Sequence, residues 1–171
     1  MPVLQLSADG TEADDVIAWV VQAKYFDGWQ KLILSNDKDF YQLCDDDTII
    51  VRPTSKEIIN KKRLIEESGI HPKNFGLARS IVGDKSDNLV GVPRVGLATV
   101  AKRFPFLKEA KDYTVKDVVF HAKENKTQVK AYASVAESRD LIETNYQIMQ
   151  LYTPIISAQS RKKLSWAVEN I

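Results

Sequence analysis

Two aspartates with one residue between them, Asp37 and Asp39, follow the apolar run 32–34 after Ser35 and Asn36. A short apolar run that comes soon after a helical pattern is typical of a buried strand in an α/β unit. Open α/β sheets bind ligands at the carboxyl ends of their strands, which is where both carboxylates fall. A capped turn after the strand explains the same residues equally well, so this pair alone leaves both interpretations open.

Two further acidic clusters lie on either side of this pair along the chain. The first, T-E-A-D-D at 11–15, opens a helical pattern, where acids also stabilise the helix dipole. Thr11 with Asp14 resembles a capping box, so this cluster taken alone favours a structural role. The other, V-G-D-K-S-D-N at 82–88, joins two helical patterns, where a solvated loop would look the same. Together the three clusters supply seven acids: Glu12, Asp14, Asp15, Asp37, Asp39, Asp84 and Asp87.

Seven carboxylates can converge only if cations offset their repulsion. Two such charges about 5 Å apart repel by roughly 3 kcal/mol at an effective dielectric constant of about 20. Oxygen ligands favour hard divalent ions, so the sequence points to Mg²⁺ or Mn²⁺. An EF-hand is excluded, because a loop read from Asp37 has Gln42 at its glycine position and Thr48 at its glutamate position. The run 45–47 is typical of a solvated turn, and we expect no metal there.

The elements that must position these acids are predicted from apolar periodicity and from glycine and proline punctuation. A helix is expected over 11–28, with Thr11 as its N-cap and Gly28 as its end. A short helix capped by Asn36 is expected at 37–44. Strands are expected at 31–35, 47–52 and 57–59.

From residue 60 onward the pattern is helical. Helices are expected at 60–68, 73–82, 96–104, 115–125, 128–136, 137–150 and 159–169. The fold class is therefore α/β, with the end of a sheet in residues 1–59 and an all-helical region in residues 60–171.

The segment 75–104 joins two of these helices through a loop that is rich in glycine. Glycines at the start of a helix let a phosphate approach free backbone N–H groups at the positive end of the dipole. A generic helical hairpin is the alternative, although it does not explain the acids beside the turn. The candidate nucleic-acid-binding residues are Lys85, Gly91, Val92, Arg94, Gly96, Thr99, Lys102 and Arg103.

Composition sets wide limits on the function. The 171 residues are 44% hydrophobic and 27% charged, as is normal for a soluble globular protein, and no apolar run is long enough to span a membrane. One cysteine, Cys44, and an N-terminus without a secretory pattern lead us to expect a cytoplasmic location. Residues 1–87 hold 11 Lys+Arg against 15 Asp+Glu, and residues 88–171 hold 13 against 8. Such asymmetry fits a metal site beside a phosphate-binding surface, and it also falls within chance.

Three stretches taken together resemble a known family. E-A-D-D, then S-N-D-K-D-F-Y-Q-L, then V-G-D-K-S-D-N-L-V-G-V-P-R-V-G are similar in order and spacing to the 5′-nuclease superfamily. That superfamily includes flap endonucleases, phage RNase H-type 5′-exonucleases and the 5′-nuclease domain of bacterial DNA polymerase I. The resemblance implies a PIN-like α/β core at 1–59 that holds two Mg²⁺ or Mn²⁺ ions, and a helix–three-turn–helix DNA-binding element at about 73–104.

The same resemblance assigns roles to residues. All seven acids would lie at or near the metals, the 91–96 loop would hold K⁺, and four acids would be catalytic: Asp14, Asp15, Asp37 and Asp39. The implied activity is structure-specific 5′-3′ exonuclease or flap endonuclease hydrolysis of DNA, or of RNA in RNA–DNA hybrids. The implied substrates are 5′-flap, nicked or RNA–DNA duplexes. Implied partners are a polymerase or a single-strand-binding protein, in a bacterial or phage-infected cell.

Two departures from the family change these expectations. Family members open with further acidic strands and a basic arch that have no counterpart before Glu12. We therefore expect a fragment or half of a split enzyme, completed by a complementary N-terminal chain and weak or inactive alone. Arg94 stands where many relatives have glycine.

Two other functions stay open. A Toprim-type domain also uses a glutamate and an Asp-x-Asp pair, but it places its glutamate at a strand end, whereas Glu12 is expected to open a helix. A non-catalytic DNA-binding module would keep the loop at 83–96 while the acids only cap helices.

Overall fold

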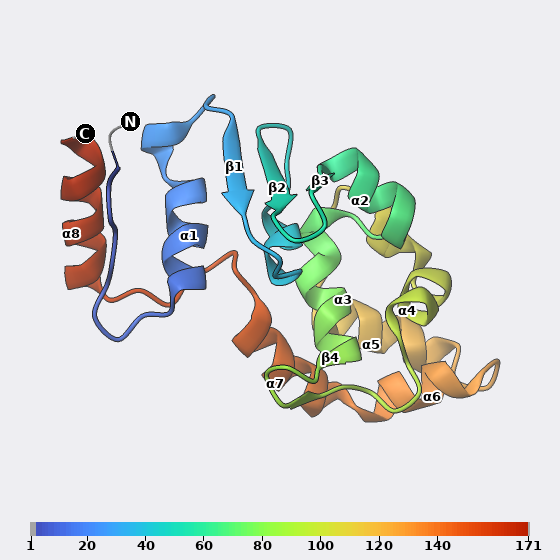
Figure 1. Ribbon diagram of the computed structural model, residues 1–171. Coiled ribbons are helices and arrows are strands. Elements are labelled where there is room, and N and C mark those ends of the chain that lie inside the picture. The colour runs from blue at the N-terminus through green and yellow to red at the C-terminus, as the bar shows by residue number, and fades with distance from the viewer. Residues whose placement is uncertain (1–2, 171) are drawn as a thin grey trace.

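The computed structural model describes residues 3–170, which form a small sheet beside a larger set of helices (Figure 1). The expected α/β class is confirmed. The elements in the first part are α1 (Ala13–Gln22), the 3₁₀ turn η1 (Lys24–Phe26), β1 (Lys31–Leu34), η2 (Asp39–Leu43), β2 (Thr48–Arg52) and β3 (Glu57–Ile59). The elements that follow are α2 (Lys61–Ser68), η3 (Pro72–Asn74), α3 (Phe75–Val82), β4 (Gly83–Asp84), β5 (Leu89–Val90), α4 (Leu97–Arg103), η4 (Pro105–Lys108), α5 (Val115–Glu124), α6 (Lys130–Glu137), α7 (Arg139–Met149) and α8 (Ala158–Glu169).

The sheet has the order β1-β2-β3, so β1 lies at an edge. β1 runs parallel to β2, with Ile33 opposite Ile50, and β3 returns antiparallel to β2. The expectation that the first strand is buried holds for only one of its faces, because Leu32 is 53% exposed and Leu34 is 69% exposed. Successive side chains of a strand point to opposite faces, and only the face that carries Ile33 is covered.

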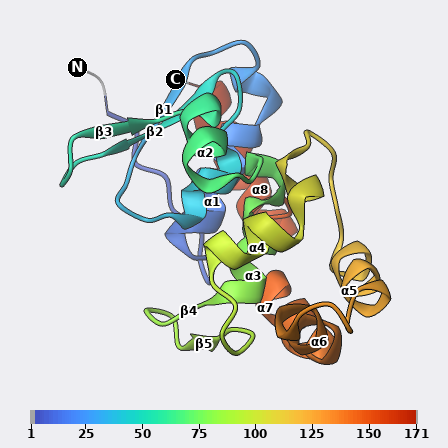
Figure 2. The same cartoon turned by 90° about the vertical axis from the view of Figure 1, so that its right-hand side faces the viewer.

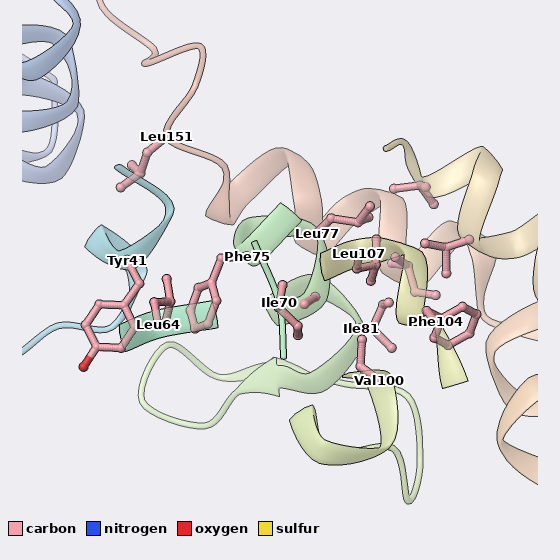
Figure 3. Close-up of a cluster of buried hydrophobic side chains, with 14 of the residues drawn as sticks. Tyr41, Leu64, Ile70, Phe75, Leu77, Ile81, Val100, Phe104, Leu107 and Leu151 are labelled. Carbon is pink, nitrogen blue, oxygen red and sulfur yellow. The ribbon is translucent and has the colours of Figure 1, made fainter. Parts of the chain in front are cut away.

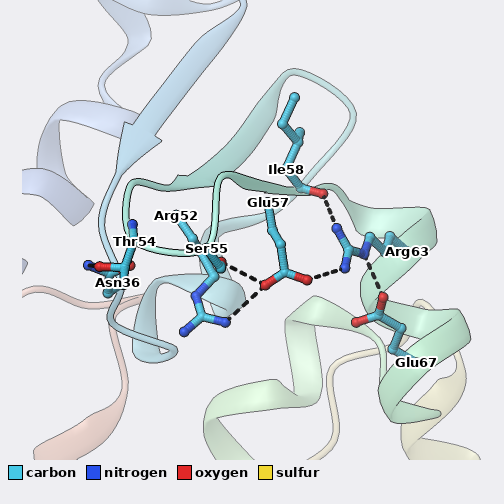
Figure 4. Close-up of polar contacts among 8 residues, drawn as sticks. All are labelled: Asn36, Arg52, Thr54, Ser55, Glu57, Ile58, Arg63 and Glu67. Carbon is cyan, nitrogen blue, oxygen red and sulfur yellow. Dashed lines mark hydrogen bonds and ion pairs between the residues drawn. The ribbon is translucent and has the colours of Figure 1, made fainter.

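Two expected helix starts also differ from the structure. The first helix begins at Ala13 rather than Thr11, its N-cap is Glu12 without a side-chain cap bond, and it ends at Gln22 before η1. The Asn36 side chain does not cap the turn after β1. It instead exchanges hydrogen bonds with Thr54, at 2.8 Å and 3.3 Å (Figure 4). A 3₁₀ turn without a side-chain cap bond therefore replaces the short helix expected at 37–44.

Each helix expected after residue 60 is present with its ends shifted by a few residues at most, but the expectation that residues 60–171 are all-helical is wrong, because β4 and β5 pair within them. The core of this region is organised around α3, in which Phe75, Leu77 and Ile81 are almost fully buried (Figure 3). Asn145 of α7 donates to the carbonyls of Ser80 and Val90, at 3.0 Å and 2.9 Å, and so ties α7 both to α3 and to β5.

The last helix returns to the first part of the chain. α8 lies beside the N-terminal segment and α1 (Figure 1), and Leu164 packs with Val16 and Ile156 in a separate small cluster. Within residues 3–170, no helix is long and apolar enough to cross a membrane.

A short pair of antiparallel strands separates α3 from α4. β4 pairs antiparallel with β5, and the pair projects beyond the ends of both helices (Figure 2). Gly83 has φ 77°, and a Cβ on Gly91 would lie 1.8 Å from the Val82 carbonyl oxygen. Glycine is therefore required at both positions, because the two backbone segments touch.

Candidate active site

The Asp37–Asp39 turn leaves β1 and directs one carboxylate inward. The hydroxyl oxygen of Ser35 accepts from the Asp37 N–H at 3.0 Å, and Asp37 Oδ1 accepts from the Asp39 N–H at 2.8 Å. These bonds satisfy the backbone N–H groups of Asp37 and Asp39 where η2 begins. Asp39 is left with a side chain only 14% exposed, facing α3.

The third cluster is held by its own loop. Asp84 Oδ1 accepts from the Ser86 N–H at 2.7 Å and from the Ser86 hydroxyl, and Asp84 Oδ2 accepts from Arg79. The bond from the Ser86 hydroxyl is the main reason that the pKa of Asp84 lies below its usual range. Asp84 is therefore oriented before any ligand arrives.

The structure brings the second and third clusters together. Carboxylate oxygens of Asp39, Asp84 and Asp87 all lie within 4.8 Å of one another. Mg²⁺–oxygen distances near 2.1 Å place opposite ligands of one ion about 4.2 Å apart, so this spacing suits a shared cation. A donor set made only of carboxylates also fits Mg²⁺ or Mn²⁺ better than a softer metal.

Burial and like charges act together on Asp39. Burial raises the pKa of Asp39 to about 6, against the attraction of Arg79 and with the help of the Asp37 charge. A buried carboxylate among other carboxylates is the electrostatic condition that a bound cation relieves.

The first cluster joins this group only in part. Burial raises the pKa of Asp14, and so do four neighbouring charges, in decreasing order those of Asp37, Glu12, Asp15 and Asp87. Asp14 therefore lies near both other clusters. Asp15 Oδ1 accepts from the Ile155 N–H at 3.0 Å, so this carboxylate also ties the segment before α8 to α1. Glu12 is exposed at the start of a helix, which is not the strand end that a Toprim-type glutamate occupies.

The candidate nucleic-acid-binding residues lie on or near the surface, with one clear exception. The Val92 side chain is 3% exposed and its N–H donates to the Ile81 carbonyl at 2.8 Å, so it belongs to the core. Gly91 is required by its backbone contact with Val82. Gly96, as N-cap of α4, has open space around it. The side chains of Lys85, Arg94 and Lys102 are exposed, and those of Thr99 and Arg103 are half-buried.

One residue of the site was missed in the sequence. Arg79 lies on α3, its Nε donates to Asp39 Oδ1 at 3.1 Å, and its Nη2 donates to Asp84 Oδ2. It is the only charged residue in the helix FGLARSIV, and a charge on an apolar helix needs a partner when it is buried. That signal was available, but it could not identify the partners.

Comparison with known proteins gives consistent likenesses. A family described as "5'-3' exonuclease, N-terminal resolvase-like domain" matches residues 1–69. The chain is 31% identical over 156 residues to a 5'-3' exonuclease of Aquifex aeolicus, which covers 91% of this chain and 50% of that protein. It is 37% identical over 98 residues to the thermostable DNA polymerase I of Thermus thermophilus, which covers 57% of this chain and 12% of that protein. The chain thus spans half or less of the length of these relatives.

The fold is also similar to a solved structure. A flap endonuclease of bacteriophage T5, in a complex with DNA and metal ions, superposes with a TM-score of 0.74 at 18% identity. The match covers 94% of this chain and 61% of that one. At this identity the likeness concerns the fold alone, and it agrees with the α/β architecture described above.

Proposed function

Because the chain belongs to the 5′-nuclease superfamily, we propose that it forms part of a structure-specific 5′-3′ exonuclease or flap endonuclease. The reaction is metal-dependent hydrolysis of phosphodiester bonds in DNA, or in the RNA strand of RNA–DNA hybrids. The observation that carries this proposal is the convergence of Asp39, Asp84 and Asp87 oxygens within 4.8 Å, from segments more than 40 positions apart.

The proposed ligands fall into two groups. Asp84 and Asp87 complete one metal position with Asp39, supported by their mutual spacing. The acids of the first two clusters contribute the other position, supported by the effect of Asp37 and Glu12 on Asp14. Two bound Mg²⁺ or Mn²⁺ ions would activate a water molecule and stabilise the leaving oxygen during in-line hydrolysis. The proposed catalytic residues are Asp14, Asp15, Asp37 and Asp39.

The proposed DNA-binding element is the helix–three-turn–helix at about 73–104. Exposed Arg94 and Lys102, with Lys85 and Arg103, would contact phosphates without reading bases, and Thr99 would add a hydroxyl donor. For K⁺ at the 91–96 loop the support is the resemblance alone. We further propose that residues 1–59 carry most of the metal site and residues 60–171 carry the nucleic-acid surface. The proposed substrates are 5′-flap, nicked or RNA–DNA duplexes, with a polymerase or single-strand-binding protein nearby in a bacterial or phage-infected cytoplasm.

A complementary N-terminal polypeptide is part of this proposal. β1 is an edge strand with two exposed leucines, and a groove of about 700 Å³ separates it from the apolar face of α1. An added strand would pair with the free edge of β1, and its side chains would pack beside Leu32 and Leu34 on the same face. We expect that cleavage by the 171-residue chain alone is weak and that such a polypeptide raises it.

The test is cleavage of a 5′-flap DNA in Mg²⁺, with and without the N-terminal part of a related 5′-3′ exonuclease added as a separate polypeptide. Asp37→Asn with Asp39→Asn should abolish cleavage. The matched control is Asp47→Asn, which makes the same change at an exposed acid outside the cluster. Salt-sensitive DNA binding without cleavage in any combination would support the non-catalytic module instead.

A further inference from the structure

α3 carries a single charge, Arg79, and that charge lies between two of the proposed metal ligands. Its side chain is 15% exposed, and the side chains of Asp39 and Asp84 are each 14% exposed. One guanidinium therefore bridges a carboxylate from the turn after β1 and a carboxylate from the loop after α3.

The hydrogen bonds of this bridge occupy some of the carboxylate oxygens and not others. Arg79 donates to Oδ1 of Asp39 and to Oδ2 of Asp84, and Ser86 donates to Oδ1 of Asp84. Within residues 3–170, Asp39 Oδ2 and both oxygens of Asp87 accept no hydrogen bond, so they stay open to a cation. Arg79 thus supplies a permanent positive charge at the edge of the space where the proposed function requires a metal.

We infer that Arg79 is a positioning residue that acts as a built-in counter-ion of the acidic site. It holds Asp39 and Asp84 together before a metal binds, and its charge weakens the binding of that metal. The effect on metal binding rests on the proposed function, whereas the coupling between Arg79 and the two aspartates does not.

The physical reason is the cost of an unpaired buried charge. Without Arg79, two mostly buried carboxylates and the nearby Asp87 would repel each other, and the loop after α3 would lose its contact with η2. With Arg79 in place, an arriving divalent ion meets a site that is one charge less negative and contains a nearby cation. Arg79 therefore lowers the metal affinity of the site, but it keeps Asp39 and Asp84 in position before the metal binds.

The first experiment measures Mn²⁺ and Ca²⁺ affinity by calorimetry for the wild type, Arg79→Met and Arg79→Lys. Methionine keeps the apolar stem and removes the charge, so metal should bind about tenfold tighter or better. Lysine keeps the charge as a compact ammonium that does not fork between two carboxylates, so its metal affinity should stay close to that of the wild type. A folded Arg79→Met protein with unchanged or weaker metal affinity overturns the inference.

The matched control is Arg63→Met. Arg63 also bridges two carboxylates, those of Glu57 and Glu67, but it lies outside the acidic cluster (Figure 4). Metal affinity in this variant should equal that of the wild type. An equal gain in both variants would mean that the total charge of the protein, rather than a local counter-ion, sets the affinity, and the inference would fail.

The second experiment needs no metal and uses thermal melting in EDTA. In the wild-type background, Arg79→Met should lower the melting temperature. In the Asp39→Asn/Asp84→Asn background the same substitution should change it little, because no carboxylate there needs a charged partner. Equal loss in both backgrounds, or failure of both proteins to fold, would mean that Arg79 only packs, and it would overturn the inference. If the wild type binds no divalent ion while this coupling is present, the metal-dependent function fails and the counter-ion role is retained.

Discussion

Arg63 and Arg79 each bridge two carboxylates, and the surroundings of the two networks differ. Arg63 donates to Glu57 at 2.6 Å and to Glu67 at 2.5 Å, and its side chain is 35% exposed. Arg52 also bonds Glu57, so two cations face two anions (Figure 4). Around Arg79 all three side chains are at most 15% exposed, and one guanidinium faces Asp39, Asp84 and the further acids near them.

The pKa values of Asp39 and Glu57, one acid from each network, move in opposite directions, whereas the pKa of Asp84 is lowered like that of Glu57. The Ser55 hydroxyl and Arg63 hold the pKa of Glu57 below its usual range, as expected for an acid in a balanced and solvated network. Burial raises the pKa of Asp39 to about 6 although Arg79 opposes the shift. An arginine partner therefore does not decide the ionisation of an acid. For Asp39, burial and the charge of Asp37 outweigh the arginine, and a buried carboxylate beside further acids distinguishes a cation-binding site from a structural ion pair.

The largest expected effect comes from neutralising acids in each network. Asp84→Asn with Asp87→Asn should reduce flap cleavage by about 100-fold or more, because both residues are proposed metal ligands. Glu57→Gln with Glu67→Gln should leave the rate within about threefold, since surface ion pairs contribute little. Cleavage rates of both double variants in Mg²⁺, under the conditions that give wild-type activity, test the contrast. Equal losses would remove the distinction between the two networks.

The second prediction uses pH without metal. The pKa of Asp39 in the folded chain lies above its ordinary value of 3.8, so its contribution to stability is complete below that value and is lost as the pH rises through about 6. In EDTA, a rise from pH 5 to pH 7 should therefore destabilise the wild type relative to Asp39→Asn. Burial lowers the pKa of His71, which shifts stability the other way over part of this range, so the difference between the two proteins is the quantity to measure.

Glu57→Gln gives the corresponding control. The folded-state pKa of Glu57 lies below 4.5, so its contribution is present above that value and is lost only as the pH falls further. The melting-temperature difference between the wild type and Glu57→Gln should therefore stay constant between pH 5 and pH 7. A change there as large as that for Asp39→Asn would contradict the assignment of the pH effect to burial.

How far the sequence alone predicts this molecule depends on the range of the interactions. The helices from residue 60 onward were predicted because their caps, glycines and apolar repeats are local features. Strands β1, β2 and β3 were predicted for the same reason, whereas the β4–β5 pair was not. The exposure of Leu32 and Leu34 was also not predicted, because it depends on which neighbours cover β1. The packing of α8 against α1 was not predicted either, because no local sequence pattern indicates it.

The candidate site shows the same limit more sharply. The three acidic clusters were visible in the sequence, whereas their proximity was an expectation that rested on the family resemblance. Arg79 contacts acids 40 positions before it and five positions after it, so its role becomes visible only once Asp39 and Asp84 are placed in space. Val92 was expected at the nucleic-acid surface but lies in the core, because the sequence does not show whether an apolar loop residue is exposed or buried.

The third prediction concerns the loop beside Asp84. Arg94 has φ 64°, a region that favours glycine, so Arg94→Gly should stabilise the fold by about 1 kcal/mol. If Arg94 also contacts a phosphate, the same change should weaken DNA binding for all sequences and lower the salt slope by about one. Chemical denaturation and DNA titrations at several salt concentrations measure the two effects. Lys102→Ala should lower the salt slope without the gain in stability.

The smallest expected effect completes the comparison of the two arginines. In EDTA, Arg63→Met should change the melting temperature much less than Arg79→Met, because its carboxylate partners can turn to water when the guanidinium is lost. Asp39 and Asp84 are too buried to do so, and their repulsion remains within the fold. High salt should reduce the small Arg63 effect further, since solvent ions screen exposed pairs more than buried ones. If the two substitutions lower the melting temperature equally at low and at high salt, solvent exposure does not explain a difference in stability between the two networks. The surplus of acids around Arg79 would then be left as the difference between them.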